Sequence, residues 1–270
     1  MALQTAWFPQ VIVSDGTISY ETGKEDKEMI SRRQMLKGVA AGTAALALSK
    51  LPGSTALASG GSGHGAQKTV SPNEAIALLK KGNARYASMK RVADPGVGPK
   101  NREPLTKGQW PYATILCCSD SRVPPELIFD EGLGRLFIVR VAGNMLVPAL
   151  LGSIEYASLH STSRLIMVMG HESCGAVGAA VHACEHPGAK ETPGINDIVN
   201  RLMPAVLKAQ KATGLHGKEL VEAAAKENVR MTVAQILDES KPLATMQEKG
   251  ELKVLGGYYG LGTGKVEIWA

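Results

Sequence analysis

Two apolar strands, each followed at once by a cluster of polar and thiol side chains, constrain this chain more than any other feature. Residues 112–118 read as a short strand that leads into Cys118-Ser-Asp-Ser-Arg122. Residues 164–170 read as a second, buried strand that leads into His171-Glu-Ser-Cys174. Because functional groups in open parallel sheets gather at the carboxyl ends of the strands, we expect both clusters at one edge of a sheet.

Strands and helices alternate through most of the chain. Ser71, followed by Pro72 and by Glu74 three residues after the cap, predicts the start of a helix over residues 71–89. Further helices are expected at 147–160, from 175 to 183, at 195–213 and at 218–239, with a strand at 136–141 and a closing hairpin of 251–259 and 265–269. This order favours an α/β fold with a mainly parallel central sheet flanked by helices.

The N-terminal region resembles a twin-arginine export signal. Arg32 and Arg33 precede the apolar run 38–48, and the small residues 56–58 allow cleavage, with Met35 where such signals more often carry Phe. The run extends about 16 Å as a helix, whereas the hydrocarbon core of a bilayer is roughly 30 Å thick. No stable membrane span is therefore expected. An amphipathic or buried, alanine-rich helix is the alternative interpretation.

This signal sets the expected domain organisation. We predict an N-terminal extension and signal peptide over residues 1–58, a flexible Gly- and Ser-rich linker over 59–70, and one catalytic domain over 71–270. Translation is expected to start at Met29, which would make residues 1–28 dispensable. The mature protein is expected outside the cytoplasm, in the periplasm or another extracytoplasmic space.

Composition excludes several other functional classes. The net charge is +5, but Lys and Arg are spread along the chain without interleaved aromatics, so no nucleic-acid partner is expected. Four cysteines are too few for a disulfide scaffold in a chain of 270 residues. Cys117 and Cys184 are expected to pack as small apolar side chains, with a disulfide as the alternative. The histidines outside the motif, at positions 64, 160, 182, 186 and 216, are expected as ordinary linker, helix or surface residues.

Cys118, His171 and Cys174 together form a donor set typical of zinc. Structural zinc sites are closed by four ligands, whereas three protein ligands leave the fourth position open for water, as in a catalytic site. If residues 118–122 are extended, Asp120 and Arg122 point the same way as Cys118 and face the metal. Each of these features alone is weak evidence for a metal site. A buried cysteine is more often a small apolar residue, and an Asp–Arg pair is more often a surface ion pair.

These motifs, together with Arg140-Val-Ala-Gly-Asn144 and the glycine-rich ending at 256–264, resemble the β-class carbonic anhydrases. The similarity covers about residues 71–270. It implies a Zn2+ enzyme for the reversible hydration of carbon dioxide to bicarbonate and a proton, with Cys118, His171 and Cys174 as the ligands. It also implies a homodimer or homotetramer built through the helix at 71–89.

The same resemblance implies roles for four further residues. Asp120 accepts a hydrogen bond from the hydroxide on zinc, and Arg122 pairs with Asp120 and keeps it off the metal. Gln109 and Gly175 line the substrate pocket. Ile115 and Cys117 stand where some members carry the tryptophan and glycine of an inhibitory bicarbonate site, so we expect a zinc site that stays open.

The sequence is also compatible with two other functions. A hydrolase of carbon disulfide or carbonyl sulfide could use the same fold and zinc, because both molecules are linear isosteres of carbon dioxide. A non-catalytic zinc-binding or redox protein could use the thiolates alone, but it would have no need of Asp120 and Arg122.

Overall fold

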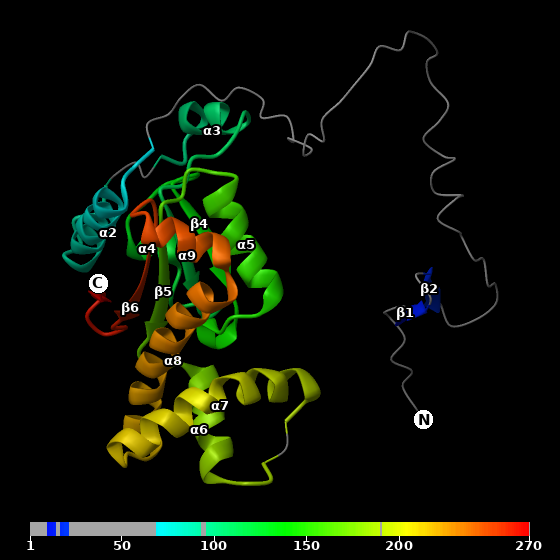
Figure 1. Cartoon of the computed structure of the whole chain (residues 1–270). Coiled ribbons are helices and arrows are strands. Elements are labelled where there is room, and N and C mark those ends of the chain that lie inside the picture. The colour runs from blue at the N-terminus through cyan, green and yellow to red at the C-terminus, as the bar shows by residue number, and fades with distance from the viewer. Residues whose placement is uncertain (1–9, 15–16, 22–68, 93–95, 190, 270) are drawn as a thin grey trace, which may run out of the picture. The chain divides into compact units, whose positions relative to one another are not determined.

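The computed structural model describes residues 10–14, 17–21, 69–92, 96–189 and 191–269 (Figure 1). Near the N-terminus, β1 (Gln10–Ser14) and β2 (Thr17–Glu21) form an antiparallel hairpin. This hairpin belongs to a separate unit from the residues that follow Gly60, and no sequence periodicity had predicted it. The predicted signal, at residues 31–58, and nearly all of the predicted linker lie outside the described residues.

A five-stranded sheet in the order β4-β3-β5-β6-β7 forms the centre of the larger unit. The strands are β3 (Ala113–Cys117), β4 (Leu136–Arg140), β5 (Leu165–His171), β6 (Lys253–Tyr259) and β7 (Val266–Trp269). The first four of these run parallel, and β7 pairs antiparallel with β6. The mainly parallel sheet and the closing hairpin predicted from the sequence are both confirmed.

Helices cover both faces of the sheet, as expected for strands that are buried on both sides. Their bounds are α2 (Pro72–Ala87), α5 (Pro148–Leu159), α6 (Gly175–Glu185), α7 (Pro193–Thr213), α8 (Gly217–Glu239) and α9 (Lys241–Glu248). Ile115 and Met167 lie in a core cluster with residues of α2, α6 and α7. Their neighbours Leu116 and Ile166 lie in a second cluster with residues of α5 and α9. Figure 1 shows α6 and α7 gathered at one end of the sheet, against the first half of α8.

Helix α2 packs closely on the rest of its own chain. Its predicted capping box is present, with Glu74 N donating to Ser71 Oγ (3.3 Å) and Ser71 N donating to Glu74 Oε2 (2.9 Å). At Gly82 the helix lies so near the backbone that an added Cβ would stand 1.8 Å from the carbonyl oxygen of Phe129. Asn83 Nδ2 donates to the carbonyl of Gly264 at 2.8 Å, which ties the helix to the turn before β7.

A buried carboxylate fixes the end of the same helix. The side chain of Asp130 is 0% exposed and accepts from Arg85 Nε at 2.6 Å and from Arg91 Nε at 3.2 Å. The backbone N–H of Val92 also donates to it, at 3.1 Å. Both arginines are therefore held on the same carboxylate, which links the segment after α2 to the chain after β3.

Several short elements escaped prediction. They are α3 (Pro99–Leu105), α4 (Pro125–Ile128), α9 and a 3-10 helix at Ala142–Asn144. The 4 residues of α4 and the 3 residues of the 3-10 helix are too few to show a helical period. None of the helices in the described part of the chain is long and apolar enough to cross a membrane.

Candidate metal centre

Three donor side chains converge at the carboxyl edge of the sheet. Cys118 follows β3 directly, His171 ends β5, and Cys174 is the N-cap of α6. Their ligand atoms all lie within 4.8 Å of one another, and all three side chains are buried. Because β3 and β5 are parallel neighbours, the residues at their carboxyl ends lie close together although the two strands are far apart in the sequence. The structure thus brings together the three residues that the sequence singled out.

The donor set fits a zinc ion. His171 Nδ1 lies 2.9 Å from the carbonyl oxygen of Glu172, so this nitrogen carries the proton and donates it. Nε2 of His171 is buried without a hydrogen-bond partner among the described residues, and an unsatisfied buried acceptor is costly unless it binds something. The sulfurs of Cys118 and Cys174 lie 4.0 Å apart, close to the about 3.8 Å expected for two tetrahedral zinc–sulfur bonds.

Local hydrogen bonds favour a thiolate at Cys118. The Cys174 thiol donates toward Cys118 Sγ, and this contact holds the pKa of Cys118 well below its usual range. The same contact raises the pKa of Cys174. The backbone N–H of Gly143 points at Cys118 Sγ from 3.3 Å. Burial, by contrast, raises the pKa of the neighbouring Cys117 to about 12, which keeps that thiol neutral.

Asp120 and Arg122 form a two-pronged ion pair beside these donors. Arg122 Nε lies 2.9 Å from Oδ1 of Asp120, and Nη2 lies 2.7 Å from Oδ2. The hydrogen bonds from Arg122 hold the pKa of Asp120 well below its usual range. The expectation that residues 118–122 are extended was wrong. The backbone N–H of Arg122 donates to Asp120 Oδ1 at 2.9 Å, which closes a tight turn.

Arg140, the last residue of β4, and Gly143, just after it, also belong to this centre, and sequence reasoning assigned them no role. Arg140 Nε donates to the carbonyl of Cys118 at 3.0 Å, and Arg140 Nη2 donates to that of Asp120 at 2.6 Å. Gly143, with φ of 75°, donates to Cys118 Sγ, and its carbonyl accepts from Asn228 Nδ2 at 2.8 Å. Their position at the carboxyl end of a third parallel strand is the sequence feature that could have identified them as part of the centre.

Among the remaining predicted site residues, Gly175 adjoins the donors, whereas Gln109 precedes the amino end of β3 and lies outside the donor group. Gly175 is the first residue of α6, next to Cys174, and an added Cβ there would meet nothing within 4 Å. Gln109 is exposed in the segment between α3 and β3. Ile115 and Cys117 are 0% exposed within β3. The substrate-binding roles of Gln109 and Gly175 stay predictions.

The cysteines outside the metal cluster do not pair. All four cysteines are free thiols. Cys184 is half-buried on α6, with its sulfur 3.8 Å from Oε1 of Gln210. The structure therefore favours packing over a disulfide for Cys117 and Cys184.

Comparison with known proteins agrees with this geometry. The family model for carbonic anhydrase matches residues 113–266. The carbonic anhydrase of Mycolicibacterium smegmatis is 40% identical over 197 residues, which cover 73% of this chain and 93% of the relative. Carbonic anhydrase 2 of Mycobacterium tuberculosis is 38% identical over 199 residues, which cover 74% and 93%.

Solved structures and the N-terminal segment complete the comparison. The β-carbonic anhydrase CcaA superposes with a TM-score of 0.57 at 27% identity, covering 73% of this chain and 86% of that one. A tetrameric β-carbonic anhydrase of Sordaria macrospora gives 0.56 at 25% identity, covering 73% and 98%. Residues 29–49 match the model for a twin-arginine translocation signal, so the chain carries a signal for export by that pathway. By motif, fold and sequence similarity, the chain belongs to the β-class carbonic anhydrase family.

Proposed function

We propose that this protein catalyses the reversible hydration of carbon dioxide to bicarbonate and a proton, with a zinc ion held by Cys118, His171 and Cys174. The observation that carries the proposal is the Asp120–Arg122 ion pair beside three buried donors. A site that only stores metal has no use for an oriented carboxylate held by a guanidinium fork. A hydration site does, because a reacting water must be oriented.

Zinc, when bound, supplies Lewis acidity that makes water a nucleophile near neutral pH. The residues around it supply orientation. The Nδ1–H of His171, bonded to Glu172 O, fixes the tautomer that leaves Nε2 as the donor atom. Asp120, held ionised by Arg122, accepts a hydrogen bond from the reacting water and selects its orientation.

Arg122 has a second task at the same carboxylate. A free carboxylate next to a dication with an open position is itself a good ligand. By engaging both oxygens of Asp120, Arg122 keeps that carboxylate out of the open position. The proton released by hydration leaves through solvent, since Asp120 and Arg122 are both partly exposed.

A stopped-flow assay of carbon dioxide hydration by the purified, zinc-loaded protein tests this proposal directly. Carbonyl sulfide and carbon disulfide should be run alongside, with sulfide release as the readout. We expect hydration of carbon dioxide and little turnover of the two sulfur compounds. A fully zinc-loaded protein that hydrolyses either sulfur compound faster than it hydrates carbon dioxide would overturn the assignment, and no turnover of any of them would point to a metal-binding role.

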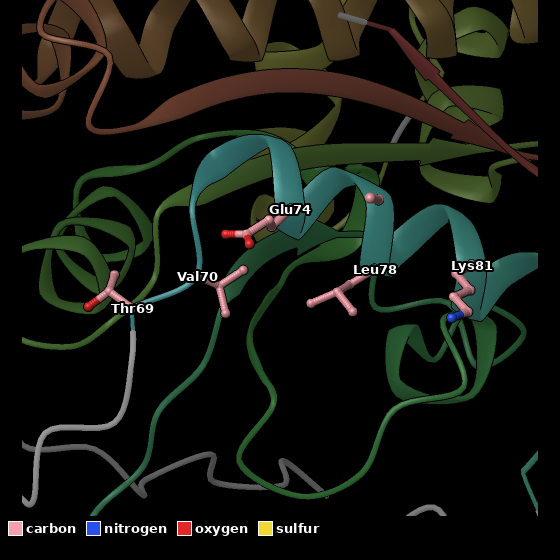
Figure 2. A pocket seen from close by; sticks show the side chains of 6 residues that line it. Thr69, Val70, Glu74, Leu78 and Lys81 are labelled. Atoms are coloured by element: carbon pink, nitrogen blue, oxygen red, sulfur yellow. The ribbon is translucent and has the colours of Figure 1, made fainter.

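We further infer a homodimer or homotetramer. The tetrameric relative from Sordaria macrospora supports this proposal. So does a hollow on the outer side of α2, which Figure 2 shows between the helix and the segment before it; it is lined by Thr69, Val70, Glu74, Ala77, Leu78 and Lys81. Light scattering on the purified protein gives the subunit number, and a monomeric mass would contradict the proposal.

The export signal supports a periplasmic or other extracytoplasmic location for a mature catalytic domain over residues 71–270. In the larger unit the first helix, α2, is capped by Ser71, and this supports a domain boundary near residue 71. N-terminal sequencing of the exported protein would locate the cleavage site, which we place after Ala58.

A further inference from the structure

The turn that carries two of the three metal donors is held from outside by helix α8. Glu222 of this helix accepts a hydrogen bond from the backbone N–H of Ser173, with Oε1 2.8 Å from the nitrogen. Ser173 lies between the donors His171 and Cys174. Glu222 itself provides no ligand atom to the group of three.

Ser173 adopts a backbone conformation that needs such support. Its φ is 52°, in the left-handed region that side-chain-bearing residues other than Asn and Asp seldom occupy. The N–H of Ser173 belongs to the peptide between Glu172 and Ser173, so the hydrogen bond to Glu222 holds the plane of that peptide. The carbonyl of Ser173 lies in the next peptide, and its direction relative to the held plane is set by the φ and ψ of Ser173.

That carbonyl points at Arg122. Nη2 of Arg122 donates to Ser173 O at 3.2 Å while it also donates to Asp120 Oδ2 at 2.7 Å. The turn after β3 and the turn after β5 are thus joined through one nitrogen. Arg122 is otherwise an exposed side chain, so this third acceptor restricts the orientation in which it meets Asp120.

Glu222 is in turn anchored in the core. The hydroxyl of Tyr258 on β6 donates a short hydrogen bond to Glu222 Oε2. Tyr258 stacks on Trp269 with ring centroids 6.4 Å apart and planes 9° apart, and Lys226 Nζ lies 4.9 Å from the centre of its ring. Burial and the nearby carboxylate raise the pKa of Tyr258, which keeps its hydroxyl protonated as the donor.

We propose that Glu222 is a positioning residue for the Asp120–Arg122 pair, acting through the backbone of Ser173. The inference rests on the proposed hydration function and deepens it. The connection runs from Tyr258 through Glu222 and Ser173 to Arg122, and so from the core beside the sheet to the carboxylate that orients water. Nothing in the motifs around Cys118 or His171 encodes it, because Glu222 lies on a helix that contributes no metal donor.

Glu222→Ala is the first test, with Glu222→Gln as the conservative variant. The alanine variant removes the acceptor for the N–H of Ser173, so kcat should fall by about tenfold or more, as for other residues that support metal sites. KM should change by less than about twofold, because the ligands and the substrate space are untouched. Glu222→Gln keeps an oxygen that accepts from Ser173, so it should retain most of kcat.

Glu227→Ala is the matched control. Glu227 is on the same helix and also holds two partners, with Lys208 Nζ at 2.7 Å and Arg230 Nη1 at 3.3 Å, but neither of them belongs to the metal centre. This variant should lose thermal stability to a similar extent as Glu222→Ala and keep the wild-type kcat. If Glu222→Ala fails to fold, Tyr258→Phe removes only the anchoring hydroxyl, and kcat should then fall by about two- to threefold, a smaller effect in the same direction.

The cobalt-substituted protein supplies a readout that does not depend on turnover. The visible spectrum of bound Co2+ reports the ligand set, and a released Asp120 should alter it in Glu222→Ala but not in Glu227→Ala. A wild-type spectrum and wild-type kcat in Glu222→Ala would overturn the inference, as would Glu222→Gln as impaired as Glu222→Ala. If the wild-type protein hydrated no carbon dioxide, the proposed function would fail, while the cobalt spectra would still decide the positioning role.

Discussion

Arg122 engages both carboxylate oxygens of Asp120, with Nε 2.9 Å from Oδ1 and Nη2 2.7 Å from Oδ2. Each oxygen therefore has a guanidinium donor of its own. This fork-to-fork geometry is the most specific form of Arg–carboxylate recognition. We expect both residues to be needed for activity. Removing Arg122 and removing Asp120 should, however, have different effects on the coordination of the metal.

Arg122→Ala should keep its zinc and lose hydration activity by at least about 100-fold, because the released Asp120 becomes a fourth protein ligand. Asp120→Ala should lose activity to a similar extent but add no ligand. Crystal structures of the two zinc-loaded variants would separate these outcomes. Three protein ligands in Arg122→Ala would contradict the proposed exclusion, and full activity of Asp120→Ala would contradict the orienting role.

Cys174→Ser should lose zinc, because a serine hydroxyl is a poor zinc ligand and only two strong donors would remain. A ligand present at about 1,000 times its Kd stabilises a fold by about 4 kcal/mol, so the variant should also melt at a lower temperature. Metal analysis and calorimetry on the same sample measure both effects. Cys184→Ser is the control and should change neither, since Cys184 lies outside the donor group. Full zinc content in Cys174→Ser would show that the ligand set is wrong.

Gly82→Ala should destabilise the protein by about 3 kcal/mol, the upper range for overpacking, because the new methyl group would meet the carbonyl oxygen of Phe129. Helix α2 would have to move away from the chain after α4. Gly152→Ala, at an exposed position of α5, is the control: a Cβ added there would meet nothing within 4 Å, so it should be neutral or stabilise by up to about 1 kcal/mol. Equal melting temperatures of the two variants would contradict the close approach of α2.

Asp130 should make part of the stability depend on pH. Burial alone would raise its pKa, but the hydrogen bonds from Arg85, Val92 and Arg91 outweigh burial and hold the pKa below its ordinary value. An aspartate in the unfolded chain titrates near 3.9, so the stabilisation is complete above about pH 4 and is lost as the pH falls through the lower, folded-state value.

Comparison with Asp130→Asn isolates this contribution, because asparagine tolerates the φ of 49° at this position. At pH 7 the variant should be less stable by about 2 kcal/mol, a value reduced from that of a fully buried pair because both arginines are partly exposed. The gap in unfolding free energy between wild type and variant should shrink as the pH falls from about 4 through the lower, folded-state pKa. A gap that is independent of pH would refute the assignment.

Export should require Arg32 and Arg33 together. Changing both to lysine should leave uncleaved precursor in the cytoplasm, since the twin-arginine signal is read as a pair rather than as positive charge. Lys37→Arg changes a basic residue of the same segment without touching the pair, and it should export normally. Immunoblots of cell fractions measure both, and normal export of the double-lysine protein would contradict a twin-arginine route.

The parts of this structure that could be predicted are those encoded locally. The apolar runs before Cys118 and His171 predicted two strands, and adjacency in a parallel sheet then predicted that their ends meet. Arg140 could not be assigned a role in the same way, because its acceptors are backbone carbonyls in the turn after β3. Glu222 was equally hidden, since its contact with Ser173 depends on how α8 crosses the sheet.

The backbone conformation of residues 118–122 was predicted wrongly. The carboxylate of Asp120 accepts from the N–H of Arg122, two residues on, and this short-range competition replaced the extended conformation that alternation had predicted. The turn still places Arg122 on Asp120, although by closing the chain on itself rather than by alternation along a strand.

Cys118 and Cys174 lie 56 residues apart in the sequence and become neighbours, with sulfurs 4.0 Å apart, only when β3 and β5 pair. Folding therefore creates the cation's coordination sphere and a potential disulfide at the same instant, because a disulfide needs only about 2 Å of further approach. An oxidant that reached the thiols first would close them off to the cation. A transport route that accepts chains already folded lets the cation be captured in the reducing cytoplasm, so the leader sequence allows the metal centre to form before export.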